Sequence, residues 1–131
     1  MNMKSFILKN FEPSELRCKC CGSIILTDNS IEAHRILQKT RDIYSRPIDV
    51  NCGTRCPNYN TEIPDASKSS EHMKGLAFDL TISSPTIDKL MILIDCARQA
   101  GFTYIRLYKK RLFIHVAYRK GFKYLLRELN E

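Results

Sequence analysis

Apolar residues recur at helical spacing in two segments of the chain. Residues 28–44 carry them amid polar residues, which predicts an amphipathic helix with Thr27 or Asp28 as its N-cap. A second series follows Pro85 and predicts a helix that ends near Gly101. The apolar positions of the two segments are Ile31, Ala33, Ile36, Leu37, Ile43, Leu90, Met91, Leu93, Ile94, Cys96 and Ala97.

Two other segments alternate with the period of a β-strand. In residues 75–80 the large apolar side chains point to one face, and Asp79 lies on the opposite face with two small residues. In residues 111–118 the same alternation places His115 in mid-strand, facing away from the aliphatic side chains. Each strand therefore presents one polar residue on a face with room around it.

The remaining segments complete a single domain. Short strands are expected at residues 48–51 and 103–108, and the second forms a hairpin with the strand that follows it. Residues 61–70 predict an irregular loop at the rim of a cleft, and residues 120–131 predict a mixed-charge tail with a short docking helix. The order of elements predicts one α+β domain whose mainly antiparallel sheet is flanked by two helices.

The composition is that of a soluble globular protein. The chain has 131 residues, of which 44% are hydrophobic and 27% charged, and it has no apolar run long enough to span a membrane. The net charge of +7 indicates affinity for polyanions such as nucleic acids, membrane surfaces and bacterial cell walls. The cations are scattered and form no recognised nucleic-acid motif, so we do not expect nucleic acid as a partner.

Residues 1–9 contain too short an apolar run for a signal peptide, so we expect synthesis in a cytoplasm and exit by lysis or in a virion. Reduced thiols are accordingly expected for the six cysteines. The set Cys18, Cys20, Cys21, Cys52 and Cys56 could hold a structural zinc ion, but its spacing differs from the paired motifs of zinc ribbons and fingers. Small buried side chains are the simpler expectation.

The clearest chemical signal is the string Ser70-Glu71-His72-Met73-Lys74-Gly75-Leu76-Ala77-Phe78-Asp79, with His115 standing 36 residues after the aspartate. Catalytic zinc takes three His or carboxylate ligands and keeps one position open. The set His72, Asp79 and His115 fits that need. The alternative is that the first two are ordinary loop and strand residues and that His115 is a hydrogen-bonded core histidine.

This string and the later histidine resemble the zinc D-alanyl-D-alanine carboxypeptidase family, which includes phage endolysins and shares its zinc site with the hedgehog signalling domain. Three further segments resemble the family in the same order: residues 10–22, residues 37–42, and residues 52–60, which are similar to its Ser-Gly-Tyr-Arg-Cys-Pro-x-x-Asn loop. The resemblance implies an α+β fold, a zinc cofactor and peptidoglycan stem peptides as substrates.

The resemblance also implies roles for residues near the metal. Arg55 matches the family arginine that binds a peptide carbonyl or terminal carboxylate, work that suits a guanidinium fork. Ser70 is expected at the substrate site together with Arg55, and its hydroxyl is expected to fix a metal ligand through a hydrogen bond. His34 is expected to be solvent-exposed on its helix. Three tyrosines could line the groove, although packing in the core or at the rim is the expectation for each: Tyr59, Tyr108 and Tyr118.

The chain departs from the family at the catalytic acid. In endolysin-like members the last ligand stands in His-x-Asp, and that position here is Ala117. Other branches place the acid where this chain has Leu112 or Lys109. Glu71, beside a predicted ligand, is the nearest substitute, ahead of the loop residues Glu62 and Asp65.

Two functions follow. The first is a zinc peptidase that acts on peptidoglycan stem peptides, as a D-Ala-D-Ala carboxypeptidase or an endolysin-type endopeptidase. The second is a catalytically weakened or inactive zinc-binding module of the same fold, which binds cell walls or serves as a virion structural part. Loss of a general acid or base typically costs on the order of 10²–10⁴ in rate, so a slow enzyme is also compatible with the sequence.

Overall fold

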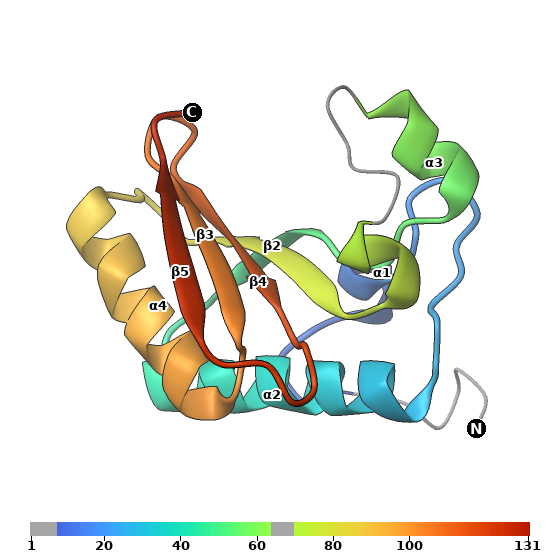
Figure 1. The fold of residues 1–131 in the computed structure, drawn as a ribbon, viewed down its shortest axis with the longest axis horizontal. Helices are drawn as coiled ribbons and strands as arrows, with labels where there is room; N and C mark the ends of the chain where they lie inside the picture. Colours follow the sequence, from blue (N-terminus) through green and yellow to red (C-terminus); the bar gives the residue numbers. More distant parts are fainter. Residues whose placement is uncertain (1–7, 64–69) are drawn as a thin grey trace.

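The computed structural model describes residues 8–63 and 70–131 (Figure 1). Within them the strands form one open sheet in the order β1-β2-β4-β3-β5. Neighbouring strands are antiparallel, except that β3 and β5 run parallel. The strands are β1 (Asp49–Cys52), β2 (Ala77–Thr81), β3 (Tyr104–Tyr108), β4 (Phe113–Ala117) and β5 (Leu125–Leu129). The prediction of an α+β fold with a mainly antiparallel sheet is confirmed.

Two long helices pack against each other and cover one face of the sheet (Figure 1). They correspond to the two segments with helical periodicity, and Thr27 caps the first through a reciprocal pair of hydrogen bonds with Ser30. Shorter helical segments lie beside β1 and β2. The helices are α1 (Pro13–Leu16), α2 (Asp28–Tyr44), α3 (Pro57–Glu62), the 3₁₀ helix η2 (Glu71–Lys74) and α4 (Ile87–Ala100).

The core lies between the two long helices and the sheet. Phe78 and Leu80 of β2 are fully buried there, as are Ile114 and Val116 of β4. Burying a side chain of this size contributes roughly 1.5–3 kcal/mol. The strand alternation turns the intervening residues to the other face, opposite α2 and α4, and this is the face that carries the polar cluster described below.

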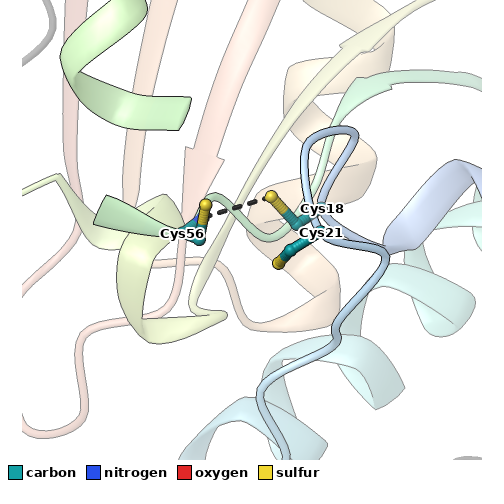
Figure 2. A group of neighbouring side chains, drawn as sticks. All are labelled: Cys18, Cys21 and Cys56. Carbon is teal, nitrogen blue, oxygen red and sulfur yellow. Dashed lines mark hydrogen bonds between the residues drawn. The ribbon is translucent and has the colours of Figure 1, made fainter. Parts of the chain in front are cut away.

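The N-terminal segment packs against the sheet edge at β1. Leu16 at the end of α1 is buried, and the backbone of Gly53 lies so close that a Cβ there would come within 2.5 Å of the Leu16 carbonyl oxygen. The turn after α1 brings Cys18 and Cys21 beside Cys56, which starts α3 (Figure 2). Segments far apart in sequence therefore meet at this edge.

The prediction of a docking helix in residues 120–131 was wrong, because this segment forms β5. Residues 125–129 pair in parallel with β3, with Leu125 opposite Tyr104 and Leu129 opposite Tyr108. Backbone hydrogen bonding at an open sheet edge outweighs the weak helical pattern of a short, half-exposed segment. The residues so added lie beside the cleft of the candidate site.

The expectation for His34 was also wrong. Its side chain is fully buried beneath the sheet, 4.8 Å edge-on from the ring of Phe78, and its Nδ1 lies 2.6 Å from the Ser30 carbonyl oxygen. Burial lowers the pKa of His34 below its ordinary value, which favours the neutral imidazole. Position 34 thus belongs to the apolar stripe of α2, whereas Cys96 is buried on α4 as expected.

None of the helices in the described part of the chain combines the length and the apolarity needed to cross a membrane. The irregular loop expected at residues 61–70 falls largely outside the described residues, and Asp65 lies there too. The apolar N-terminal residues that bear on a signal peptide also lie mostly outside them.

Candidate metal centre and substrate cleft

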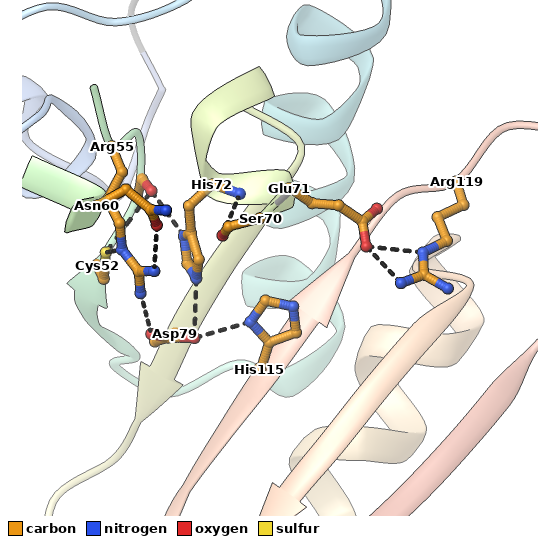
Figure 3. A network of polar contacts seen from close by, with 10 residues as sticks. Cys52, Arg55, Asn60, Ser70, Glu71, His72, Asp79, His115 and Arg119 are labelled. Carbon is orange, nitrogen blue, oxygen red and sulfur yellow. Dashed lines mark hydrogen bonds and ion pairs between the residues drawn. The ribbon is translucent and has the colours of Figure 1, made fainter. Parts of the chain in front are cut away.

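Asp79 is the centre of a polar cluster on the face of the sheet opposite α2 and α4 (Figure 3). Asp79 on β2 and His115 on β4 are direct cross-strand partners, and His115 Nδ1 lies 3.0 Å from Asp79 Oδ1. The Nε2 atom of His72 approaches the same oxygen at 3.2 Å. The structure thus brings the three predicted ligands together, with two imidazole nitrogens directed at one carboxylate oxygen.

His72 reaches the cluster from η2, which lies just before β2 in the chain. The hydroxyl of Ser70 caps this helix by accepting a hydrogen bond of 3.3 Å from the His72 amide. Gly75 ends it in the left-handed conformation, with φ of +70°, and a Cβ there would lie 3.0 Å from the Ile25 carbonyl oxygen. Glycine therefore meets both the conformational and the spatial requirement of this turn.

The orientation of His72 is fixed by a backbone carbonyl. Its Nδ1 donates a hydrogen bond of 2.7 Å to the Gly53 carbonyl oxygen, which leaves Nε2 facing Asp79. A histidine ligand in a metal site usually donates its second ring nitrogen in this way. His72 is 2% exposed and His115 is 4% exposed. Two oriented imidazoles and a carboxylate form the donor set that zinc prefers, so these residues fit the ion that the sequence implies.

Charge complementarity shifts the protonation of the cluster. Burial lowers the pKa of His72, but its hydrogen bonds to Asp79 and Cys52 outweigh burial and raise the pKa to about 9. Burial raises the pKa of Asp79, yet hydrogen bonds from His115 and His72 hold it well below its ordinary range. Burial is the larger effect for His115, whose pKa is lowered. A divalent cation therefore competes with a proton on His72.

Cys52 is a further donor that the sequence analysis did not assign to this site. It is the β1 partner of Asp79, and its sulfur, a nitrogen of His72 and an oxygen of Asp79 lie within 4.8 Å of one another. Burial raises the pKa of Cys52, but the hydrogen bond and charge of His72 and the charge of Arg55 outweigh it and lower the pKa. The family resemblance could have indicated Cys52, because Cys52 is the first residue of the segment 52–60 that resembles the family's arginine loop.

Arg55 lies against the opposite oxygen of the central aspartate. Its guanidinium is 3.6 Å from Asp79 Oδ2 and donates to Asn60 Oδ1 at 3.1 Å and to the Cys52 sulfur at 3.3 Å. The side chain is mostly buried but lines the cleft. Asn60, which the sequence analysis included only as part of the loop motif, therefore orients the arginine.

Glu71 points away from the metal cluster (Figure 3). Its Oε1 accepts from Arg119 Nε at 2.7 Å and lies 2.6 Å from a terminal nitrogen of the same guanidinium. Arg119 also lies over the ring of Tyr104, at 4.1 Å from the centroid. The carboxylate is thus held at the cleft wall, and it must turn away from Arg119 to reach a metal-bound group.

The other positions considered for an acid lie in unsuitable surroundings. Ala117 is fully buried against Ala77 and Tyr104. Leu112 packs against the core in a left-handed turn, with φ of +56°. Lys109 forms an ion pair of 3.7 Å with Glu128. Glu62 lies on the surface at the end of α3.

The cluster opens into a cleft of about 920 Å³. Its wall is a series of cations stacked on aromatic rings, with Arg106 beside Tyr104 and Tyr108, and Arg111 over Tyr108 and Phe113. Tyr108 thus lines the cleft, whereas Tyr118 packs against the core. The cationic side chains that line the cleft are Arg55, Arg106, Lys110, Arg111 and Arg119. A ligand with carboxylates or other anionic groups suits this wall.

A family model described as Peptidase M15 matches residues 9–117. The matched region extends from the segment before α1 through the end of β4, so it contains His72, Asp79 and His115, and β5 lies beyond it. A search of curated proteins finds no match to the chain. Since the family match covers well over half of the sequence and contains the whole candidate metal centre, the chain belongs to the Peptidase M15 family.

Proposed function

We propose that this protein is a zinc-dependent peptidase that acts on peptidoglycan stem peptides, as a D-Ala-D-Ala carboxypeptidase or an endolysin-type endopeptidase. Membership of the Peptidase M15 family supports peptidase chemistry. The observation that carries the proposal is the convergence of His72 and His115 on one oxygen of Asp79 at the cleft.

Zinc held by His72, Asp79 and His115 would supply Lewis-acid polarisation of a peptide carbonyl and activation of water. The protein's own residues bind and orient the substrate. Arg55, anchored by Asn60, is placed to pair with a substrate carbonyl or terminal carboxylate. Stem peptides carry several carboxylates, which the cationic cleft wall complements.

Proton transfer is assigned to Glu71. It is the carboxylate of the cleft lining that lies next to a predicted metal ligand in sequence. Both of its contacts to Arg119 involve Oε1. Rotation about its side-chain bonds would free the Glu71 carboxylate from this ion pair for proton transfer in the cleft, and Arg119, whose side chain is 37% exposed, can remain in solvent.

The second candidate function is a zinc-binding module with weakened or no turnover, which binds cell walls or serves in a virion. It is favoured by the absence of a carboxylate at Ala117, Leu112 and Lys109 and by the engagement of Glu71 with Arg119. Synthesis in a cytoplasm, with release by lysis or in a virion, is compatible with both proposals.

Incubation of the zinc-loaded protein with purified muropeptides, followed by mass spectrometry, separates the two. The peptidase proposal predicts loss of D-Ala or cleavage within the stem, and no product from a His115→Ala control. Intact muropeptides, from a protein that binds stoichiometric zinc and sediments with purified cell walls, would instead establish the binding module.

A further inference from the structure

A second cluster of metal-binding side chains lies outside the site described above. The sulfur atoms of Cys18, Cys21 and Cys56 lie within 4.8 Å of one another, at the edge where the N-terminal segment meets the start of α3 (Figure 2). Zinc–sulfur bonds of about 2.3 Å place the sulfurs of a tetrahedral site about 3.8 Å apart. The thiols therefore need to approach by only about 1 Å, a change that χ1 rotations can supply.

A tight turn holds two of these thiols on one side. The Gly22 amide donates to the Cys18 carbonyl oxygen at 2.8 Å, and the Cys18 amide donates to the Ser23 carbonyl oxygen at 2.8 Å. Gly22 has a φ of +74°, which allows the chain to reverse there. Cys18 and Cys21 are separated by two residues, the spacing of one half of a zinc ribbon site, which the overlapping Cys20 obscured in the sequence analysis.

The sulfur of Cys18 accepts several backbone hydrogen bonds. The Cys56 amide donates to it at 3.2 Å, and the amides of Cys21 and Cys20 are also directed at it. Burial raises the pKa of Cys18, but these three amides and the Cys56 thiol outweigh burial and lower the pKa to about 7. The hydrogen bond from the Tyr59 amide lowers the pKa of Cys56, but burial and the neighbouring thiols outweigh it and raise the pKa to about 11, so the negative charge of the pair lies on Cys18. Amide donors around a sulfur stabilise the thiolate, which is the form that binds metal.

We propose that Cys18, Cys21 and Cys56 bind a structural zinc ion that ties the turn after α1 to the loop carrying Arg55. Cys20 lies in the same turn and is exposed, outside the set of three sulfurs that lie within 4.8 Å of one another, so the proposal rests on these three alone. Cys18 is buried, Cys56 is half-buried and Cys21 is exposed, an arrangement that gives an ion access from solvent.

A metal ion accounts for the arrangement better than a disulfide does. A disulfide would use two of the three clustered thiols and leave the third outside the bond, although all three sulfurs converge. The backbone donors at Cys18 stabilise negative charge on a sulfur, which a disulfide does not carry. Zinc uses every sulfur of the set without an oxidant.

A metal ion at the cysteine cluster would help to position the loop that carries Arg55 beside the candidate metal centre. Cys56 follows Arg55 directly, and Thr54 is held to the N-terminal segment by a hydrogen bond of 3.0 Å to the Leu16 carbonyl oxygen. An ion at the cysteine cluster would add a strong link at the same junction. The ion would therefore fix the loop of residues 53–56. In this loop the Gly53 carbonyl orients His72, and the Arg55 guanidinium faces Asp79.

Zinc content of the reduced full-length protein, measured by inductively coupled plasma mass spectrometry after removal of unbound metal, tests the proposal. We expect about two zinc ions per chain in the wild type and about one in either Cys21→Ser or His115→Ala. Cys96→Ala, which removes a thiol outside both clusters, should retain the wild-type content. Because Cys21 is exposed, its replacement leaves the packed core intact.

A second measurement tests the proposal even if the Cys21→Ser variant misfolds. In a Cys52→Ser, His115→Ala background, where the first site has lost its thiol and one imidazole, titration with a mercurial reagent should release the remaining zinc in step with thiol modification. The proposal is overturned if a folded Cys21→Ser protein keeps the wild-type zinc content, if zinc release does not follow thiol modification, or if the protein purified with zinc contains a Cys18–Cys56 disulfide. Zinc content is independent of muropeptide cleavage, so failure here is distinct from failure of the peptidase proposal.

Discussion

At the scale of single residues, the site depends on one carboxylate that serves three neighbours. Asp79 receives His72 and His115 on Oδ1 and Arg55 on Oδ2. The alternation of β2 and β4 was enough to predict that Asp79 and His115 share a face. The position of Cys52 could not be predicted with the same ease, because it depends on how β1 pairs with β2 across a register shift.

The role of Glu71 can be tested at this scale. We expect Glu71→Gln to lower muropeptide cleavage by on the order of 10²–10⁴, since it removes the proposed proton acceptor without changing side-chain size. Arg119→Gln breaks the same ion pair but leaves the carboxylate, so its activity should stay within a fewfold of the wild type. Equal losses in the two variants would show that the ion pair, and not proton transfer, is what matters.

The raised pKa of His72 predicts how stability depends on pH. His72 has an ordinary pKa of 6.5 and a folded pKa of about 9, so the folded state binds the proton more tightly. This contribution to stability is fully present below about pH 6.5 and is lost as the pH rises through about 9. In urea unfolding with a chelator, the wild type should lose more than about 1 kcal/mol over this interval relative to His72→Gln. Parallel pH profiles would contradict the assignment.

At the scale of elements, periodicity predicted the two long helices and the strands of the site, because each buries a regular face. Periodicity gave wrong predictions where tertiary contacts determine the structure of a segment or the burial of a residue. Residues 125–129 have little local preference and become a strand only because β3 offers an open edge. His34 was misplaced because a polar residue within an apolar stripe can be buried when its ring nitrogen meets a backbone carbonyl.

The turn that ends η2 offers an element-scale test. Gly75→Ala places a side chain in a left-handed conformation and against the Ile25 carbonyl, so we expect a loss of roughly 1–3 kcal/mol in unfolding free energy and weaker zinc binding through displacement of His72. Gly121→Ala is the matched control, since its φ is +79° but nothing lies within 4 Å of the added Cβ. It should cost less and leave zinc affinity unchanged. Equal effects on zinc would argue against a positioning role for this turn.

At the scale of the whole molecule, the site is assembled from parts distant in sequence. The arginine loop, η2, β2 and β4 each contribute a side chain or a carbonyl, and the N-terminal segment packs beneath the loop. The donor set is therefore complete only in the folded chain, and a metal ion that binds this set stabilises the folded chain.

Zinc should therefore raise the thermal stability of the intact protein. At a free zinc concentration about 100-fold above the dissociation constant, one site contributes about 2.7 kcal/mol, which corresponds to an increase of several degrees in Tm. Differential scanning calorimetry with and without a chelator measures this shift. A shift of the same size in a His115→Ala, Cys21→Ser double variant would show that zinc acts at neither cluster.

Anomalous diffraction above and below the zinc absorption edge locates the metal directly in crystals of the zinc-loaded protein. We predict an anomalous peak bonded to His72 Nε2, Asp79 and His115 Nδ1 at about 2.0–2.2 Å, facing the cationic cleft. Crystals of zinc-loaded protein with no peak among these three side chains would show that they do not form the metal site.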